Sequence, residues 1–214
     1  MEPPQKQDSY AVAYSKAQKD LEGLNILERA RSAGFVVETK PEEVIRLDFL
    51  GQNAKLIVDE RAVVDAETGE PLPLWSQILI LHYLRDVKEG VEPAGRWITF
   101  KEVPSGEFYL SAFNRRSKEL AIRFFGRNPD LLHEVAPKLG GERFSEIGDV
   151  SYLFRVFPKV PVVLVMYRAD EEFPPDANIL FDATIPEFLC TEDIAVISTM
   201  LIVALGKLAQ KIKG

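Results

Sequence analysis

The sequence has few of the residues that most often bind soft metals or act as nucleophiles. Among its 214 residues there is one cysteine, Cys190, and there are two histidines, His82 and His133. A single cysteine excludes an intramolecular disulfide and any metal site built from several cysteines. The chain also has no G-x-G-x-x-G fingerprint, no Walker loop, no G-x-S-x-G elbow and no C-x-x-C pair. An enzyme built from this sequence would therefore depend on carboxylates, arginines or tyrosines.

Positive charge and long apolar segments are lacking as well. The formal net charge is −7 at pH 7, which disfavours nucleic acid and anionic membranes as partners. The longest apolar run near the end of the chain, residues 194–205, is interrupted by Ser198 and Thr199 and is too short to span a bilayer. Residues 1–8 are polar and do not form the apolar core of a signal peptide. We therefore expect a soluble, cytoplasmic protein that binds neither nucleic acid nor membrane.

Length and composition predict one domain. A hydrophobic content of 46% is ample for a core, and 214 residues fit a single domain. We expect this domain to span residues 9–214. Residues 1–8 contain two prolines and no apolar anchor, so they are expected to be disordered.

Apolar residues that recur at steps of three and four predict several helices. The first is expected to begin at Ser9, to be divided near Gly23 and to end at Gly34, a residue that readily follows the last turn of a helix. The other helices are expected to begin near Pro73, Asn128 and Glu192.

Alternating residues in the first half of the chain predict an antiparallel meander. Residues 44–50 place Arg46 and Asp48 on one face and apolar side chains on the other. A hairpin loop at 51–53 leads into a second strand at 54–58, and a third strand follows at 62–65. Because no helix crosses between these strands, the pattern excludes a Rossmann-type unit.

A second β region lies later in the chain. Residues 151–157 alternate and residues 160–167 are continuously apolar, which predicts a hairpin whose second strand is covered on both faces. Pro161 is expected at a strand start or on an edge. The fold class predicted from all these patterns is α+β, with an antiparallel sheet (meander plus hairpin) packed against buried helices and the N-terminal helix docked outside.

Two arginines are a candidate anion site. Residues 97–100 and 107–113 are read as short strands around a turn, and Arg115 and Arg116 follow directly at the expected strand-to-helix boundary. Free backbone N–H groups at a helix start, together with guanidinium groups, can hold an anionic ligand. The alternative is a solvated or salt-bridged pair.

An acidic loop is a candidate metal site. Asp170, Glu172 and Asp176 lie close together in sequence, and Asp182 follows after a short apolar segment. Crowded carboxylates repel unless a cation, an arginine or a raised pKa relieves them, and oxygen ligands suit Mg²⁺ or Ca²⁺. The spacing is not that of an EF-hand loop. The alternative is a solvated acidic loop with no bound ion.

Cys190 directly precedes Thr191, which is expected to cap the final helix. A thiol at a helix N-terminus can have a lowered pKa and react. Three nearby acidic residues oppose thiolate formation, and we favour a buried, inert cysteine; these residues are Glu187, Glu192 and Asp193.

Three pieces of the sequence are informative together: Trp97–Phe100 with Gly106–Tyr109 and Phe113, then 158–161, then 170–182 with 191–193. In this order they resemble a prokaryotic family known as domain of unknown function 3786. The resemblance implies a bacterial or archaeal protein, and an association with iron–sulfur or corrinoid proteins. The family has no established catalytic residue to carry over. This chain lacks the cysteines that would hold an iron–sulfur cluster of its own.

The sequence leaves three functions open. The leading hypothesis is a ligand- or partner-binding protein, accessory to a metallocofactor redox system. The second is a carboxylate-based or Mg²⁺-dependent enzyme that uses the acidic loop, which requires at least three of its carboxylates to converge. The third is a structural subunit of a complex, which requires an exposed apolar patch.

Overall fold

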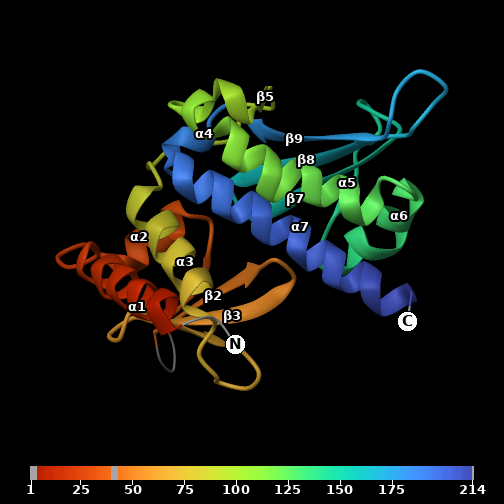
Figure 1. The fold of residues 1–214 in the computed structure, drawn as a ribbon. Helices are drawn as coiled ribbons and strands as arrows, with labels where there is room; N and C mark the ends of the chain where they lie inside the picture. Colours follow the sequence, from red (N-terminus) through yellow and green to blue (C-terminus); the bar gives the residue numbers. More distant parts are fainter. Residues whose placement is uncertain (1–3, 40–42, 214) are drawn as a thin grey trace. The chain divides into compact units, whose positions relative to one another are not determined.

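The computed structural model describes residues 4–39 and 43–213 (Figure 1). This part of the chain divides into two compact units. Unit 1 holds the residues up to Val91 together with Glu187–Leu189, and unit 2 holds Glu92–Pro186 and the residues from Cys190 onward. Each unit contains helices and an antiparallel sheet, so the α+β class is confirmed. The single α+β domain expected over residues 9–214 stays a prediction.

The helices of unit 1 are α1, α2 and α3. The expected division near Gly23 is confirmed: Gly23 has a φ of 79°, and the Asn25 side chain caps the next helix by accepting a hydrogen bond from the Glu28 amide at 3.2 Å. The first helix begins at Pro4, earlier than the expected Ser9, because proline is tolerated in a first helical turn. The bounds are Pro4–Lys19, Ile26–Ser32 and Leu74–Asp86.

Two expectations for the N-terminal region have different outcomes. Disorder was expected for residues 1–8, of which 1–3 lie outside the described residues and 4–8 belong to α1. Within unit 1 the Tyr14 hydroxyl donates to the Arg61 carbonyl at 3.3 Å, and the Gln18 side chain donates to the Glu60 carbonyl at 2.8 Å. The external docking of this helix stays a prediction.

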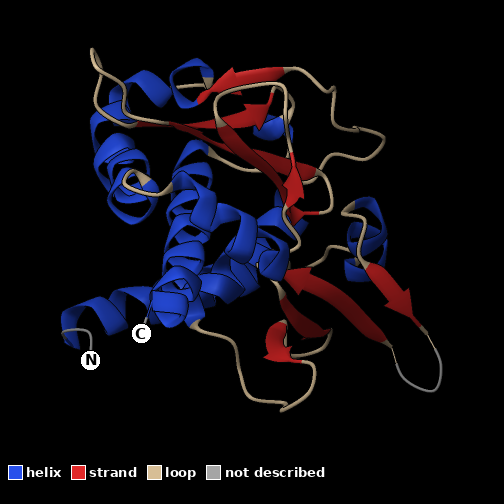
Figure 2. Ribbon diagram, turned by 90° about the vertical axis from the view of Figure 1, so that its right-hand side faces the viewer, coloured by secondary structure: helices blue, strands red, loops and turns tan. Residues whose placement is uncertain are grey.

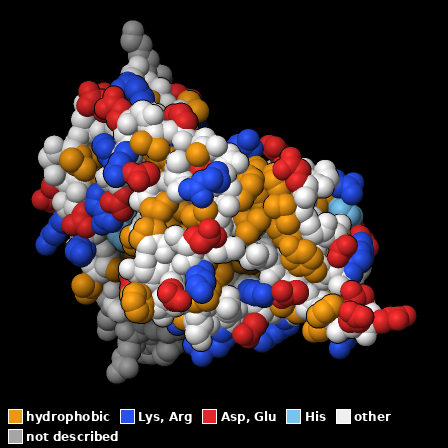
Figure 3. All heavy atoms as spheres, turned by 90° about the horizontal axis from the view of Figure 1, so that it is seen from above, with side chains coloured by type: hydrophobic (Ala, Val, Ile, Leu, Met, Phe, Trp, Pro, Cys, Tyr) orange, Lys and Arg blue, Asp and Glu red, His pale blue; other side chains and the backbone are white. Residues whose placement is uncertain are grey.

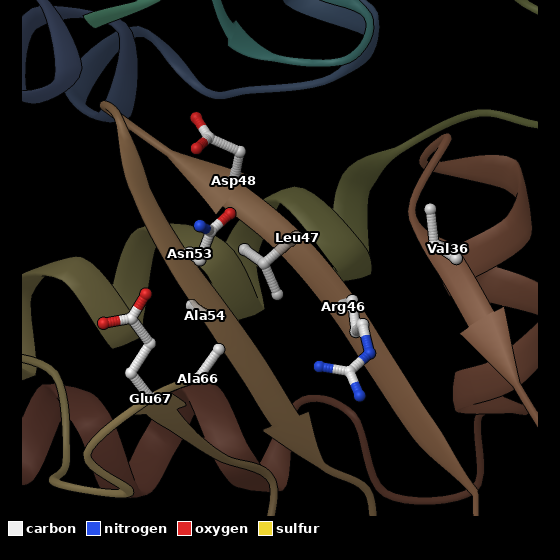
Figure 4. A pocket seen from close by; sticks show the side chains of 8 residues that line it. All are labelled: Val36, Arg46, Leu47, Asp48, Asn53, Ala54, Ala66 and Glu67. Atoms are coloured by element: carbon white, nitrogen blue, oxygen red, sulfur yellow. The ribbon is translucent and has the colours of Figure 1, made fainter. Parts of the chain in front are cut away.

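The meander forms the sheet of unit 1, as predicted. Its four strands pair in chain order, all antiparallel, and are β1 (Val36–Glu38), β2 (Val44–Phe49), β3 (Gln52–Ile57) and β4 (Ala62–Asp65). The apolar side of β2 is buried, while Arg46 and Asp48 are exposed on the other face. Helix α3 lies behind the buried face (Figure 4). Its buried Gln77 accepts from the Val63 amide at 2.8 Å and donates to the Leu72 carbonyl at 2.7 Å.

The β2–β3 turn contains a strained residue. Leu50 and Gly51 connect the strands with φ angles of 52° and 76°, which is the left-handed conformation that a two-residue hairpin turn requires. Glycine adopts the left-handed conformation freely, whereas in leucine the Cβ atom makes this conformation sterically unfavourable.

We therefore expect Leu50→Asn to stabilise the protein by about 1 kcal/mol, because asparagine tolerates the left-handed region far better than leucine. The measurement is the midpoint of urea unfolding. Leu24→Asn is the control, since Leu24 is an exposed leucine that has no positive φ. A loss of stability in Leu50→Asn larger than in the control would contradict the prediction.

The hairpin belongs to a separate five-stranded sheet in unit 2, so the expectation of one sheet built from meander plus hairpin is corrected. All pairs are antiparallel, in the order β5-β9-β8-β7-β6. Among the described residues, each strand pairs only with strands of its own sheet. The strands are β5 (Trp97–Thr99), β6 (Glu142–Arg143), β7 (Val150–Phe157), β8 (Val160–Tyr167) and β9 (Asp176–Asp182).

Strand β8 behaves as its continuous apolar run predicts. Its residues from Val160 to Met166 are all buried. Pro161 lies at the start of the strand, opposite Arg155, where the register with β7 shifts and a missing N–H is tolerated. On one face the buried Val163, Val165 and Leu180 pack against partly buried apolar side chains, which are Trp97, Phe144, Ile147 and Leu153.

The other face of this sheet is covered by helices (Figures 1 and 2). One of these helices, α4, includes residues 107–113. The strand that was expected there is therefore wrong. Aromatic residues favour strands only when the surrounding packing suits a strand. Here Phe113 turns inward and stacks on Phe100 at 4.0 Å between ring centroids, while Phe108 is 88% exposed.

The helical run continues without a break beyond α4. The segments are α4 (Gly106–Phe113), the π-helical η2 (Asn114–Lys118) and α5 (Glu119–Phe125). As expected, a helical region also starts directly after Asn128 and another near Glu192. They are η3 (Pro129–Leu131), α6 (Leu132–Val135), η4 (Ala136–Leu139) and α7 (Thr191–Lys213). Among the described residues, no helix is both long and apolar enough to cross a membrane.

The surface mixes apolar and charged side chains. Seen from above the view of Figure 1, hydrophobic side chains form a band that is interspersed with and bordered by both signs of charge (Figure 3). Apolar atoms contribute a large share of the surface of any folded protein, so concave features carry more information about function.

Candidate functional site: a hollow on the four-stranded sheet

A hollow of about 420 Å³ lies on the exposed side of the unit 1 sheet (Figure 4). This volume falls within the range of small-molecule sites, which combine an apolar lining with a few polar groups. Helix α3 occupies the opposite side of the sheet, so the hollow faces away from it. The lining residues are Val36, Arg46, Leu47, Asp48, Asn53, Ala54, Ala66 and Glu67.

The register of the sheet brings these residues together. Val36 of β1 lies opposite Arg46 of β2, and Asp48 of β2 lies opposite Asn53 of β3. Residues two apart on a strand share a face, so Arg46 and Asp48 point to the same side. The side chains of Leu47 and Ala54 are buried, which leaves mainly their backbone to form the floor.

The turn after β4 contributes the remaining wall. Asp65 accepts hydrogen bonds from the amides of Glu67 and Thr68, both at 2.9 Å, and from the Gln52 side chain at 2.9 Å. These bonds lower the pKa of Asp65 to about 2, and the bond from Gln52 has the largest effect. The Ala66 amide donates to the Asn53 carbonyl at 3.0 Å. Together the contacts hold Glu67 beside β3.

The charged side chains of the hollow are only partly engaged. Arg46 Nε donates to Glu38 Oε1 at 2.8 Å, and Asp48 Oδ1 accepts from the Gly51 amide at 3.2 Å. Within the described residues, the other guanidinium nitrogens of Arg46, Oδ2 of Asp48 and the carboxylate of Glu67 have no hydrogen-bond partner. The hollow therefore offers one cationic and two anionic groups to a ligand.

The sequence contained part of this signal. Alternation in residues 44–50 already placed Arg46 and Asp48 on one face, but that face was read only as solvent-exposed. The contributions of Asn53 and Glu67 depend on strand register and on the turn after β4, which alternation within a single strand does not specify.

Arg115 and Arg116 are exposed and lie inside the π-helical segment η2, in the middle of a helical run. The expected strand-to-helix boundary is therefore wrong, and the free N–H groups of a helix start are not available at these residues. Adjacent residues on a helix also point in different directions. An anion site at these arginines stays a prediction, and the free N–H groups of a helix start no longer support it.

The structure does not bring the four candidate metal-binding carboxylates together. Asp176 is the first residue of β9 and Asp182 is the last, so the strand separates them by its full length. Asp176 accepts from Lys118 Nζ at 3.0 Å. Asp170 accepts from the amides of Glu172 and Phe173 at 2.8 and 2.7 Å, a local turn. No group of three or more potential ligands suited to a metal ion occurs within the residues described.

Asp182 has a structural role instead. It is 1% exposed and accepts hydrogen bonds from the amides of Ala94, Gly95 and Thr184 at 3.0, 2.6 and 2.9 Å, and from the Thr184 hydroxyl at 2.6 Å. Burial opposes its ionisation, but these donors together hold the pKa of Asp182 below its ordinary value. Its oxygens anchor the loop before β5 to the end of β9.

Comparison with known proteins assigns the chain to a family. A family model described as "Domain of unknown function (DUF3786)" matches residues 25–204. The chain belongs to the DUF3786 family. This confirms the resemblance found in the sequence. No curated protein and no solved structure matches the chain.

The region matched to DUF3786 contains every residue that lines the hollow. It also contains a hydrogen-bonded network in unit 2 that sequence patterns did not indicate. His133 Nδ1 and the Tyr152 hydroxyl are 2.7 Å apart, and Arg168 donates to Asp130 at 2.6 Å. The bond from Arg168 is the main cause of a lowered pKa of Asp130. Asp130 also lies 3.5 Å from His133 Nε2.

Cys190 precedes α7 within the DUF3786 region. The helix begins at Thr191, so Cys190 rather than Thr191 is the residue that flanks it. The residue is exposed, not buried as expected, and its thiol donates to Asp193 Oδ2 at 3.1 Å. Partial burial of the sulfur is the main cause that raises the pKa of the Cys190 thiol to about 11, and the charge of Asp193 adds to it. A thiol with this pKa is almost entirely protonated at neutral pH.

Proposed function

We propose that this protein binds a small polar molecule in the hollow on its four-stranded sheet. The observation that carries the proposal is the combination of a ligand-sized concavity with polar groups that have unused hydrogen-bonding capacity. Arg46 and Asp48 stand on rigid strands and not on a loop, so their positions are defined before a ligand arrives. The hollow therefore supports recognition better than the dispersed acidic loop does.

The family resemblance extends this proposal to a cellular role. It supports a bacterial or archaeal protein that acts in the cytoplasm as an accessory to iron–sulfur or corrinoid proteins. A net charge of −7 is consistent with partners other than nucleic acid. In this role the hollow would bind a metabolite, and metallocofactor chemistry would take place on a partner protein.

Binding of a protein partner is a second candidate function. Phe108 on α4 is 88% exposed and Phe173 is 65% exposed, and aromatic residues are enriched at protein–protein interfaces. A partner captured by the wild-type protein should be lost from Phe108→Ser. Capture that is unchanged in both Phe108→Ser and Phe173→Ser would remove this candidate.

The small-molecule proposal is tested by NMR on the full-length ¹⁵N-labelled protein with mixtures of small metabolites of all charge classes. A true ligand is expected to shift the amide resonances of β2 and β3, and to bind at least about tenfold more weakly to Asp48→Asn or Arg46→Gln, since each variant removes a charge-assisted hydrogen bond. Glu70→Gln is the control, because Glu70 is exposed and does not line the hollow.

Two results would contradict the proposal. One is a set of ligands whose shifts all map outside β1 to β4. The other is the absence of any shift at millimolar concentration across all charge classes, since even a weak specific site is occupied at that level.

A further inference from the structure

We propose that the ligand of the hollow is a short zwitterion, such as a dipeptide with free termini. This inference rests on the proposed function and specifies its ligand class. It follows from how the charges are distributed around the hollow. Figure 4 shows the carboxylates of Asp48 and Glu67 on one side of Leu47 and the guanidinium of Arg46 on the other.

The acidic side suits an ammonium group. Asp48 Oδ1 accepts from the Gly51 amide, which leaves Oδ2 without a partner among the residues described. Glu67 is held by its backbone amide, which donates to Asp65, so its carboxylate stays available. The Asn53 side chain lies between these two carboxylates in Figure 4 and can supply a further oxygen acceptor. An ammonium has three N–H donors, which matches this set of acceptors.

The basic side suits a carboxylate. Arg46 uses Nε for its ion pair with Glu38 at 2.8 Å, and its two terminal nitrogens remain for a ligand. A guanidinium can donate two parallel hydrogen bonds to one carboxylate. Glu38 neutralises part of this charge, so an isolated anion gains little at Arg46. A zwitterion gains more, because its ammonium is bound by the acidic side at the same time.

The middle of the hollow suits a short, largely apolar linker. Val36 and Ala66 present small aliphatic side chains, and Leu47 and Ala54 contribute the floor. Val36 is 61% exposed, so a ligand that contacts it removes apolar surface from water. Because the charged side chains are exposed to solvent, the affinity is expected to be modest and to fall as the ionic strength rises.

The experiment uses alanyl-alanine and two capped forms with the full-length protein, in NMR titrations of the β2 and β3 amides. The N-acetyl form lacks the ammonium and the C-terminal amide lacks the carboxylate. Each cap is expected to weaken binding at least about tenfold, because it removes one charged contact. Asp48→Asn should weaken the binding of the uncapped dipeptide much more than the binding of the N-acetyl form. Arg46→Gln should weaken the binding of the uncapped dipeptide much more than the binding of the amide form.

Two controls isolate the hollow. Glu38→Gln removes the ion pair of Arg46 without removing a lining residue, so the dipeptide should bind as well or better. Glu70→Gln should leave binding unchanged. Equal binding of capped and uncapped dipeptides, or no shift of β2 and β3 with any of them, would overturn the zwitterion assignment. In that case the metabolite screen still decides whether the hollow binds another class of molecule, so the two proposals fail separately.

Discussion

Replacing Asp182 by alanine is expected to destabilise the protein by about 3–5 kcal/mol, a large fraction of the stability of a typical domain. The substitution removes an acceptor of four hydrogen bonds at a site that is 1% exposed. The amides of Ala94 and Gly95 and the amide and hydroxyl of Thr184 would lose their charged acceptor, and each hydrogen bond to a charged group contributes about 1.5–3 kcal/mol. The measurement is the free energy of unfolding from urea denaturation.

Asp176→Ala is the matched control for this prediction. Asp176 lies at the other end of the same strand and forms an ion pair with Lys118. The Asp176 side chain is 51% exposed. Exposed ion pairs contribute little, so the expected loss is below about 1 kcal/mol. Losses of similar size in the two variants would show that the hydrogen bonds of Asp182 do not have the assigned role.

The lowered pKa of Asp182 also predicts a dependence on pH. Because this pKa is lower in the folded than in the unfolded state, ionised Asp182 contributes stability above its unfolded pKa of about 3.9. That contribution is lost as the pH falls through the folded pKa. Asp182→Asn cannot ionise, so the gap in stability between wild type and Asp182→Asn should narrow as the pH falls below about 4. A gap that is constant from pH 7 to pH 3 would contradict the assignment.

Phe100→Ala is expected to destabilise the protein by a similar amount, about 3–5 kcal/mol. Phe100 is 1% exposed and stacks on Phe113 at 4.0 Å between ring centroids, and Phe181 meets both rings edge-on at 6.4 and 6.2 Å. Removal of one ring leaves a cavity among three packed elements. Urea denaturation again gives the free energy of unfolding.

The control is Phe108→Ala, which removes the same side chain from a position that is 88% exposed and should change stability by less than about 0.5 kcal/mol. A double-mutant cycle between Phe100 and Phe113 should give a coupling of about 0.5–1.5 kcal/mol beyond the area buried. Equal effects of Phe100→Ala and Phe108→Ala would show that the aromatic cluster is not part of the core.

Local periodicity predicted much of the fold correctly. The alternation in residues 44–50 defined the strand β2 and its exposed face, and the continuous apolar run at 160–167 defined a strand buried on both sides. Gly23 marked the division between α1 and α2. These features depend on residues a few positions apart, so they are visible in a linear sequence.

The wrong predictions concern residues whose structure is decided by contacts with parts of the chain that are far away in sequence. Aromatic residues at 107–113 suggested a strand, but the segment is a helix. In this helix Phe113 stacks on Phe100, and Gly106 passes close to the Phe100 backbone. A Cβ at Gly106 would lie 1.9 Å from the Phe100 carbonyl oxygen, so only glycine fits this approach. Asp182 looked like a member of an acidic cluster because the sequence does not show its donors, Ala94 and Gly95.

The sequence by itself therefore determined the α+β class, most of the strands and helices, and the polar face that carries Arg46 and Asp48. Tertiary structure alone decided that the meander and the hairpin form separate sheets, and that Asp176 and Asp182 stand at opposite ends of one strand. It also decided that Asn53 and Glu67 join Arg46 and Asp48 around one hollow. The physical reason is that side-chain periodicity is local, whereas strand register and burial depend on residues far apart in the chain.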